Sequence, residues 1–204
     1  MDISNLLWTG PISYPYMVRM GVPPDGSCFF HAILLAFYKQ YQNQSEDGVP
    51  ISRSKLVKDF RHDLSLRLGE NIDLVDPSSP IVYDTLSRGT LRDFSKDMPE
   101  YSLSSMQKEL DSDSPIDNAY HEFISNEVRK DIYILDNEKQ DVYITGSDLD
   151  ILYKGRPSIV LLYIPGHFEL VGIRNSDGSI STYFDSEHPF IQRLNERLHE
   201  LAKV

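Results

Sequence analysis

The spacing of apolar residues changes character near the middle of the chain. Up to about residue 129, apolar residues recur at intervals of three and four, which predicts helices. The helices expected in this half cover about 28–41, 52–68, 102–110 and 118–129. Short β-branched and aromatic runs then predict strands at 131–135, 142–145, 158–164, 167–173 and 182–184. Helices followed by strands predict an α+β or α/β/α layered fold.

Three further stretches complete the pattern. Residues 1–22 mix aromatic residues with Pro and Gly, which predicts an irregular or extended lead-in. Residues 70–118 are rich in Ser, Asp and Pro, which predicts loops with short helices between them. A helical pattern over about 189–203 ends the chain. With 204 residues and no internal repeat, we expect a single domain over 1–204.

The helix expected at 28–41 is apolar on nearly every side, so we expect it to be buried. The turn before it, Pro23 to Ser27, offers Ser27 or Asp25 as the N-cap. Cys28, the only cysteine, would stand at the helix N-terminus, where free N–H groups and the helix dipole favour a thiolate. The alternative is that Cys28 is a small buried hydrophobe, which is the usual fate of a lone cysteine.

The turn also has features that suit acyl transfer. Gly26 would allow a tight turn and leave room for a substrate. The main-chain N–H groups from Asp25 to Cys28 would then face an oxygen that becomes negative during the reaction. From the turn and the helix alone, a nucleophile and a packed cysteine remain equally open.

Composition and charge narrow the class of protein. The net charge of −11, from 20 basic and 31 acidic residues, argues against a nucleic-acid partner and favours a basic protein partner. One cysteine excludes an intrachain disulfide and a cysteine-rich zinc module. The N-terminus lacks the pattern of a signal peptide, and no apolar run is long enough to span a bilayer. We therefore expect a cytoplasmic, monomeric protein in a reducing compartment.

Two motifs carry a resemblance to a known family. The stretch from Asp25 to Ile33, Asp-Gly-Ser-Cys-Phe-Phe-His-Ala-Ile, resembles the nucleophile motif of the OTU (ovarian tumour) family of cysteine proteases. Far downstream, Gly166-His167-Phe168-Glu169 resembles the histidine motif of the same family. The resemblance covers about 21–184 and implies a papain-like architecture, with a central, mainly antiparallel sheet between helices.

The resemblance also implies roles for four residues. Cys28 would be the nucleophile and His167 the general base. Glu169 would orient His167, where the family usually has Asp or Asn, and Asp25 matches a residue that is commonly counted with the catalytic ones. The strand pattern supports one of these assignments. Side chains two apart on a strand share a face, which places His167 and Glu169 together. Without the Cys28 motif, an exposed His–Glu strand face would be the better interpretation.

Two other histidines are candidates for a base or a metal ligand. His31 follows Cys28 by one helical turn and would lean back toward the thiol, but we expect it to be a packing residue. His121-Glu122 begins like a zinc-protease helix, yet position 125 is Ser, so the second histidine ligand is missing. The sequence therefore implies no metal and no organic cofactor.

The expected function is that of a deubiquitinase, which hydrolyses the isopeptide bond between the ubiquitin C-terminus and a lysine. The expected partners are ubiquitin, polyubiquitin chains and ubiquitin-like modifiers. The family occurs in eukaryotes, their viruses and some bacterial pathogens, so a viral copy would act in the host cytoplasm. Two alternatives remain: a ubiquitin-binding module with a weak or dead site, and a redox or structural protein with a packed cysteine.

Overall fold

The fold is seen in a computed structural model that describes residues 2–145 and 148–203. After two short strands the chain enters the predicted buried helix, and most of the other helices follow it in the first 130 residues. The α-helices are α1 (Cys28–Phe37), α2 (Lys39–Asn43), α3 (Arg53–Leu68), α4 (Val82–Thr85), α5 (Leu91–Phe94), α6 (Leu103–Leu110), α7 (His121–Val128), α8 (Leu149–Leu152) and α9 (Pro189–Ala202). The 3₁₀ helices are η1 (Leu86–Gly89), η2 (Pro99–Tyr101) and η3 (Asn118–Tyr120).

The strands form one main sheet in the order β1-β2-β8-β7-β5-β6, with β9 paired to β8. The strands of this sheet are β1 (Ile3–Asn5), β2 (Met17–Met20), β5 (Asp131–Asp136), β6 (Asp141–Val142), β7 (Ser158–Ile164), β8 (His167–Arg174) and β9 (Ile180–Ser181). All pairs in it are antiparallel except β5 with β7. A small hairpin joins β3 (Ser45–Glu46) to β4 (Val49–Pro50).

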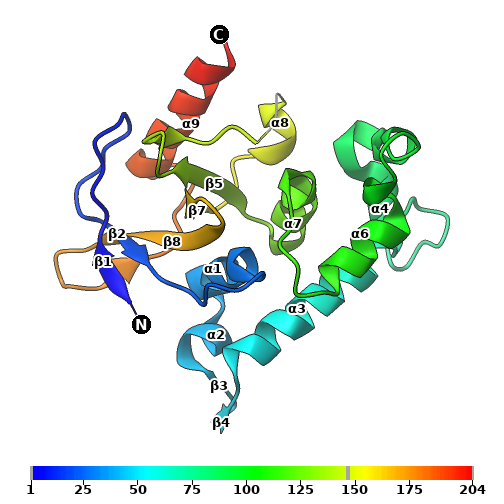
Figure 1. Ribbon diagram of the computed structural model, residues 1–204, viewed down its shortest axis with the longest axis horizontal. Coiled ribbons are helices and arrows are strands. Elements are labelled where there is room, and N and C mark those ends of the chain that lie inside the picture. The colour runs from blue at the N-terminus through cyan, green and yellow to red at the C-terminus, as the bar shows by residue number, and fades with distance from the viewer. Residues whose placement is uncertain (1, 146–147, 204) are drawn as a thin grey trace.

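Each face of the main sheet carries its own layer of helices (Figure 1). Along β7, Ile159 and Leu161 pack with α1, whereas Val160 and Leu162 pack with α9. This alternation follows from the two-residue period of a strand, and the continuous apolar run is typical of a strand buried on both faces. The result is the predicted α/β/α layered fold with a mainly antiparallel sheet.

The helix predicted at 28–41 is two helices. Tyr38 has φ −92° and ψ 107°, so α1 ends there and α2 starts at a new angle. All residues of α1 from Cys28 to Ala36 are buried, as the all-round apolar pattern predicts. Helix α3 begins at the predicted place, where Ser52 Oγ accepts a hydrogen bond from Lys55 N.

The lead-in at residues 1–22 is more regular than its sequence indicates. It contains β1 and β2, and β2 pairs with β8 from Met17–Ile173 to Met20–Leu170. The stretch Met17-Val-Arg-Met is short and has no clear alternation, so its pattern resembles a loop. Its strand conformation depends on the partner strand, which lies about 150 residues further along the chain.

Two other sequence predictions are wrong in detail. The strand expected at 182–184 is not formed: the chain pairs with β8 at β9 instead, and Phe184 makes only an isolated bridge to Ser158. The strand expected at 142–145 shrinks to β6, which ends at Val142. Both segments are short and lie at sheet edges, where local pattern specifies register weakly.

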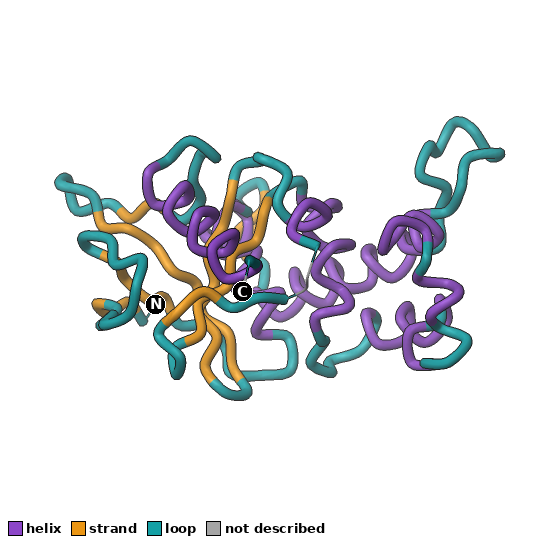
Figure 2. The backbone as a smooth tube through the Cα atoms, turned by 90° about the horizontal axis from the view of Figure 1, so that it is seen from above, coloured by secondary structure: helices purple, strands orange, loops and turns teal. Residues whose placement is uncertain are grey.

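The helices α3 to α6 extend away from the sheet and form a separate arm of the molecule (Figure 2). Leu56, Leu64 and Leu68 of α3 are buried, as are Met106 and Leu110 of α6. The two helices pack on each other through these predicted faces, although Phe60 and Leu103 are only half-buried. Within the described residues, no helix is long and apolar enough to cross a membrane.

Candidate active site

Cys28 is the first residue of α1, as predicted from the turn before it. The residue is 7% exposed, so the thiol is largely covered by its neighbours. Ser27 occupies the N-cap position, but its side chain makes no capping hydrogen bond to the helix. Of the two N-cap candidates, Ser27 therefore holds the position but not the capping bond, because its hydroxyl accepts a hydrogen bond from Arg61 Nη1 at 2.8 Å.

Asp25 folds the turn in front of Cys28. Its Oδ1 accepts a hydrogen bond from Ser27 N at 2.8 Å, and its main-chain oxygen accepts one from Cys28 N at 3.2 Å. Its Oδ2 lies 3.3 Å from His31 Nε2. These contacts hold the turn, and they place the Asp25 carboxylate on the His31 side of Cys28.

His31 lies inside the molecule with 1% of its surface exposed. Its Nδ1 lies 2.7 Å from the Tyr41 hydroxyl, so Tyr41, His31 and Asp25 form a hydrogen-bonded chain. Burial lowers the pKa of His31, although the Asp25 carboxylate opposes that change. A neutral, doubly hydrogen-bonded imidazole of this kind fits the packing role expected for His31.

The strand β8 brings the second motif to Cys28. Ile164 and His167 face each other across a tight turn that contains Pro165 and Gly166, so His167 is the first residue of β8. The main-chain N–H of Phe168 donates a hydrogen bond to Cys28 Sγ, with the nitrogen 3.4 Å from the sulfur. The beginning of β8 is therefore fixed directly against the thiol.

His167 and Glu169 share a face of β8, as the strand period predicts. His167 Nε2 lies 3.9 Å from Glu169 Oε2, and Glu169 Oε1 accepts from Arg19 Nε at 2.6 Å. His167 Nδ1 is buried and has no hydrogen-bond partner among the described residues. With Nε2 turned toward the carboxylate, Nδ1 is the nitrogen that remains to accept a proton.

The environment of the thiol differs from the sequence prediction in one respect. Burial raises the pKa of Cys28, although hydrogen bonds from the N–H groups of Phe168 and Phe29 oppose the change. The negative charge of Asp25 raises this pKa further. The helix N-terminus alone therefore does not make the thiol acidic, and a base must take up its proton.

Gly26 also serves a purpose other than the predicted one. A Cβ atom at this position would lie 1.9 Å from the main-chain oxygen of Asp113. The loop after α6 thus occupies the space that we expected to be open for a substrate. Among the N–H groups expected to face an oxyanion, those of Ser27 and Cys28 bond to Asp25, which leaves those of Asp25 and Gly26 as donors.

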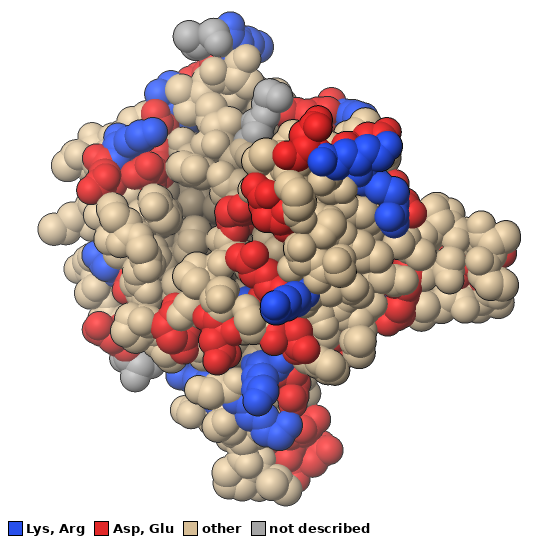
Figure 3. Space-filling model, turned by 45° about the vertical axis from the view of Figure 1, so that its right-hand side comes forward, with Lys and Arg blue, Asp and Glu red and all other residues tan. Residues whose placement is uncertain are grey.

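The loop at residues 111–118 forms one wall of the site. One small cavity beside the turn is lined by Asp25, His31 and Asp113, among others, and a second by Phe29, Phe168 and Asp117. Asp25, Asp113 and Asp117 are exposed. Acidic side chains also predominate across the middle of the face in Figure 3, in keeping with the net charge. A basic segment would find complementary charge along this rim.

Two arginines near the site were not predicted from the sequence. Arg19 lies on β2 and pairs with Glu169, but β2 was not predicted. Arg61 lies on the buried face of α3, at apolar spacing between Val57 and Leu64. A cation at an apolar position was a usable signal, because a charge is rarely buried without strong partners.

His121 is the buried first residue of α7, and it lines the small cavity that Phe29, Asp117 and Phe168 also line. Its Nδ1 lies 3.1 Å from Thr145 Oγ1, and its ring contacts the Tyr153 ring edge-on. Within residues 2–145 and 148–203, no group of three or more His, Cys, Asp or Glu side chains is arranged to hold a metal ion.

Comparison with solved structures identifies the fold. An ovarian tumour (OTU) domain in complex with ubiquitin aligns with a TM-score of 0.54 and 16% identity, over 91% of this chain and 84% of that one. The Hazara virus OTU bound to ubiquitin gives a TM-score of 0.43 at 16% identity, over 85% and 90%. The viral OTU domain protease from Farallon virus gives 0.40 at 14% identity, over 85% and 98%.

No protein-family model matches the sequence, and neither does any curated protein. The similarity is therefore one of fold, and it rests on the ovarian tumour domain in complex with ubiquitin. The chain has an OTU-like fold. This confirms the fold that the two sequence motifs implied.

Proposed function

We propose that this protein is a thiol-dependent deubiquitinase that hydrolyses the isopeptide bond between the ubiquitin C-terminus and a lysine. One observation carries the proposal: the Phe168 N–H donates to Cys28 Sγ, which brings the His167 strand to the only thiol of the chain. A nucleophile, a base and a residue that orients the base are the parts that acyl transfer to a cysteine needs.

The proposed reaction begins with proton transfer from Cys28 Sγ to His167 Nδ1. The thiolate attacks the carbonyl carbon of the ubiquitin C-terminal glycine, and the N–H groups of Asp25 and Gly26 bind the oxygen that becomes negative. His167 returns its proton to the lysine amine as the C–N bond breaks, which leaves a thioester on Cys28. Water, deprotonated by His167, then cleaves the thioester and releases the ubiquitin carboxylate and the thiol.

Glu169 is assigned to orient His167. Its carboxylate is 11% exposed and lies on the Nε2 side of the ring, where it stabilises the imidazolium formed during the reaction. Arg19 holds the other carboxylate oxygen through two nitrogens, at 2.6 Å and 2.5 Å. The contacts of Asp25 support a different role for that residue, which is to shape the turn and the oxyanion donors within it.

The proposed substrates are ubiquitin, polyubiquitin chains and ubiquitin-like modifiers with a similar C-terminus. The acidic rim of Asp25, Asp113 and Asp117 is complementary to the basic C-terminal tail of ubiquitin. The chemistry uses only a thiol, an imidazole and water, so the proposed enzyme works without a metal or an organic cofactor. It acts as a monomer in the reducing cytoplasm, which would be that of the host if the protein is viral.

The proposal is tested with ubiquitin that bears an electrophile at its C-terminus. We expect a covalent adduct that maps to Cys28 and is absent in Cys28→Ala, whose far-UV circular dichroism stays that of the wild type. Wild-type protein that folds and forms no adduct would contradict the proposal. An adduct at a side chain other than Cys28 would contradict the assigned nucleophile.

A second function is favoured by the resting state of the thiol. Burial raises the pKa of Cys28, and the described contacts of its Sγ include the Phe168 N–H but no hydrogen bond to His167. A ubiquitin-binding module with a catalytically weak site would have these features. Turnover of a ubiquitin substrate at a rate that depends on His167 would exclude this alternative.

A further inference from the structure

Arg61 on α3 is a cation with 2% of its surface exposed. Its guanidinium carbon lies 4.4 Å from the centre of the Phe30 ring, and all its hydrogen-bond partners are neutral oxygens. A buried charge is costly unless it is well hydrogen-bonded, and here four hydrogen bonds use four of the five guanidinium N–H groups. The position of Arg61 is therefore strictly defined by the groups around it.

Those groups come from three separate segments. Nε donates to Leu110 O and Nη2 to Glu109 O and Ser114 O, each at 2.8 Å, so the guanidinium closes the C-terminal end of α6 and the loop after it. Nη1 donates to Ser27 Oγ at 2.8 Å, next to Cys28. Carbonyls at a helix C-terminus lack partners within the helix and favour a nearby cation, which accounts for the first set of bonds.

The hydrogen bond from Arg61 to Ser27 replaces the usual N-cap bond of α1. A serine at an N-cap normally accepts a hydrogen bond from its own helix, which stabilises the helix. Ser27 makes no such bond and accepts from Arg61 instead. The turn before Cys28 is thus tied to α3 and α6 at the expense of the local cap.

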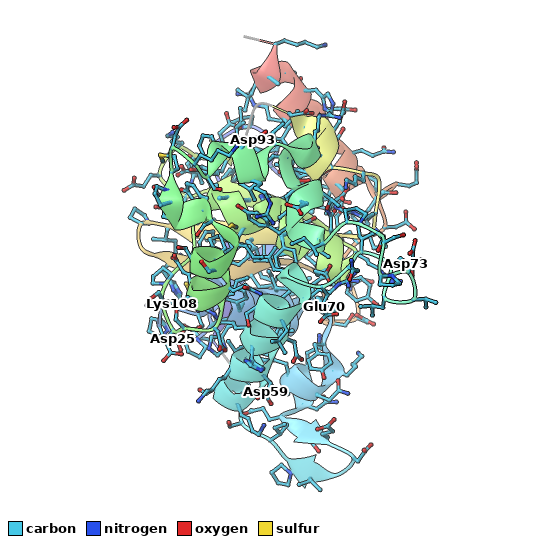
Figure 4. All side chains as sticks on the ribbon, turned by 90° about the vertical axis from the view of Figure 1, so that its right-hand side faces the viewer. Asp25, Asp59, Glu70, Asp73, Asp93 and Lys108 are labelled. Atoms are coloured by element: carbon cyan, nitrogen blue, oxygen red, sulfur yellow. The ribbon has the colours of Figure 1, made fainter. Side chains whose placement is uncertain are left out.

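The loop after α6 is also packed directly on this turn. A Cβ at Gly26 would lie 1.9 Å from Asp113 O, so the two main chains touch. Asp25 and Lys108 of α6 lie on the same side of the molecule, and Asp73 lies on the opposite side (Figure 4). Arg61 is the one described side chain that bonds to Ser27 Oγ, to α6 and to Ser114 together.

We propose that Arg61 is a positioning residue that fixes Cys28 Sγ against the Phe168 N–H by clamping the turn at 25–27 to the loop at 111–114. The proposal rests on the proposed function for its effect on catalysis, but its effect on the thiol is independent of that function. The planar guanidinium has five N–H donors on three nitrogens, and these three nitrogens reach the four acceptor oxygens at once. Lysine, with one nitrogen on a flexible stem, cannot replace it.

The test uses Arg61→Lys, Ser27→Ala and a matched control, Arg156→Lys. Arg156 is also largely buried and also makes several hydrogen bonds, to Asp131, Asn126 and Ser125 among others, none of which lies in the turn at 25–27 or the loop at 111–114. Two properties are measured below the melting temperature of every variant. One is the kcat and KM for a ubiquitin substrate, and the other is the rate at which iodoacetamide alkylates Cys28 across a pH series.

For Arg61→Lys and Ser27→Ala, we expect the alkylation profile to move to higher pH by about half a unit or more, because the thiolate loses the Phe168 N–H. We expect kcat to fall by about tenfold with little change in KM. Arg156→Lys should lower the melting temperature and leave both properties unchanged. If Arg61→Lys does not fold, Ser27→Ala decides, because it removes only the bond between the clamp and the turn.

The result that would overturn the proposal is an alkylation profile for both folded variants that coincides with that of the wild type. Arg61 would then stabilise the fold without positioning the thiol. Wild-type protein that lacks ubiquitin-cleaving activity would instead contradict the proposed function. The alkylation profiles would still decide the role of Arg61 in that case, because the chain has a single cysteine.

Discussion

At the scale of single residues, the structure separates two carboxylates that the sequence left in competition. Glu169 Oε2 lies 3.9 Å from His167 Nε2, whereas Asp25 bonds to Ser27 and lies 3.3 Å from His31. Glu169→Gln keeps an acceptor but loses the charge that stabilises the imidazolium. We expect kcat/KM for ubiquitin cleavage to fall by about tenfold or more, yet less than in Cys28→Ala.

The comparison variant is Asp25→Asn, whose single amide oxygen can still accept from Ser27 N while its NH2 group faces His31 Nε2. It should retain most of the activity and the melting temperature, because Asn replaces Asp well in such turns. The measurements are kcat/KM and thermal unfolding for both variants. A stable but inactive Asp25→Asn, together with an active Glu169→Gln, would move the orienting role to Asp25.

At the scale of elements, the hairpin between β7 and β8 sets the position of the base. Gly166 has φ +78°, a conformation that costs a residue with a Cβ about 1 to 2 kcal/mol. Gly166→Ala should therefore lower Tm by about 2 to 4 °C for each kcal/mol lost. Since His167 is the next residue, we also expect kcat/KM to fall.

A matched control stands at the other end of the same strand. Gly178 has φ +87° in the turn after β8, and a Cβ there also meets open space. Gly178→Ala should lose a similar amount of stability and keep the wild-type kcat/KM. Equal activity losses in the two variants would show that general destabilisation, and not the placement of His167, is responsible.

At the scale of the whole molecule, stability should depend on pH through a buried histidine between the layers. Burial lowers the pKa of His121 from 6.5 to about 4. The folded state binds its proton more weakly than the unfolded state does, so this contribution is fully present above pH 6.5 and is lost as the pH falls toward 4. The pKa difference corresponds to about 3 kcal/mol in the free energy of unfolding.

Urea unfolding at a series of pH values between about 7 and 4 measures this effect. The free energy of unfolding should fall less steeply with acid in His121→Gln than in the wild type. His199→Gln, at an exposed position on α9, should keep the wild-type slope. An unchanged slope in His121→Gln would show that other groups cause the acid sensitivity.

The candidate site was only partly predictable from the sequence. Cys28 at a helix start and His167 at a strand start follow from local patterns. The first is a turn before an all-apolar run, and the second is a run with aromatic and aliphatic residues after Pro-Gly. The contacts that join them were not predictable. The Phe168 N–H to Sγ bond links residues 140 apart, and Arg19 reaches Glu169 across 150 residues from a strand without a clear pattern.

The sequence by itself determined the buried helix of Cys28, the apolar faces of α3 and α6, the strands β5, β7 and β8, and the amphipathic α9. These elements have long or strongly periodic apolar patterns, and such patterns depend only on neighbours along the chain. The tertiary structure alone decided the strand β2, the break at Tyr38, the clamp by Arg61 and the raised pKa of Cys28. Each of these depends on burial or on a partner distant in sequence, and neither is encoded in local periodicity.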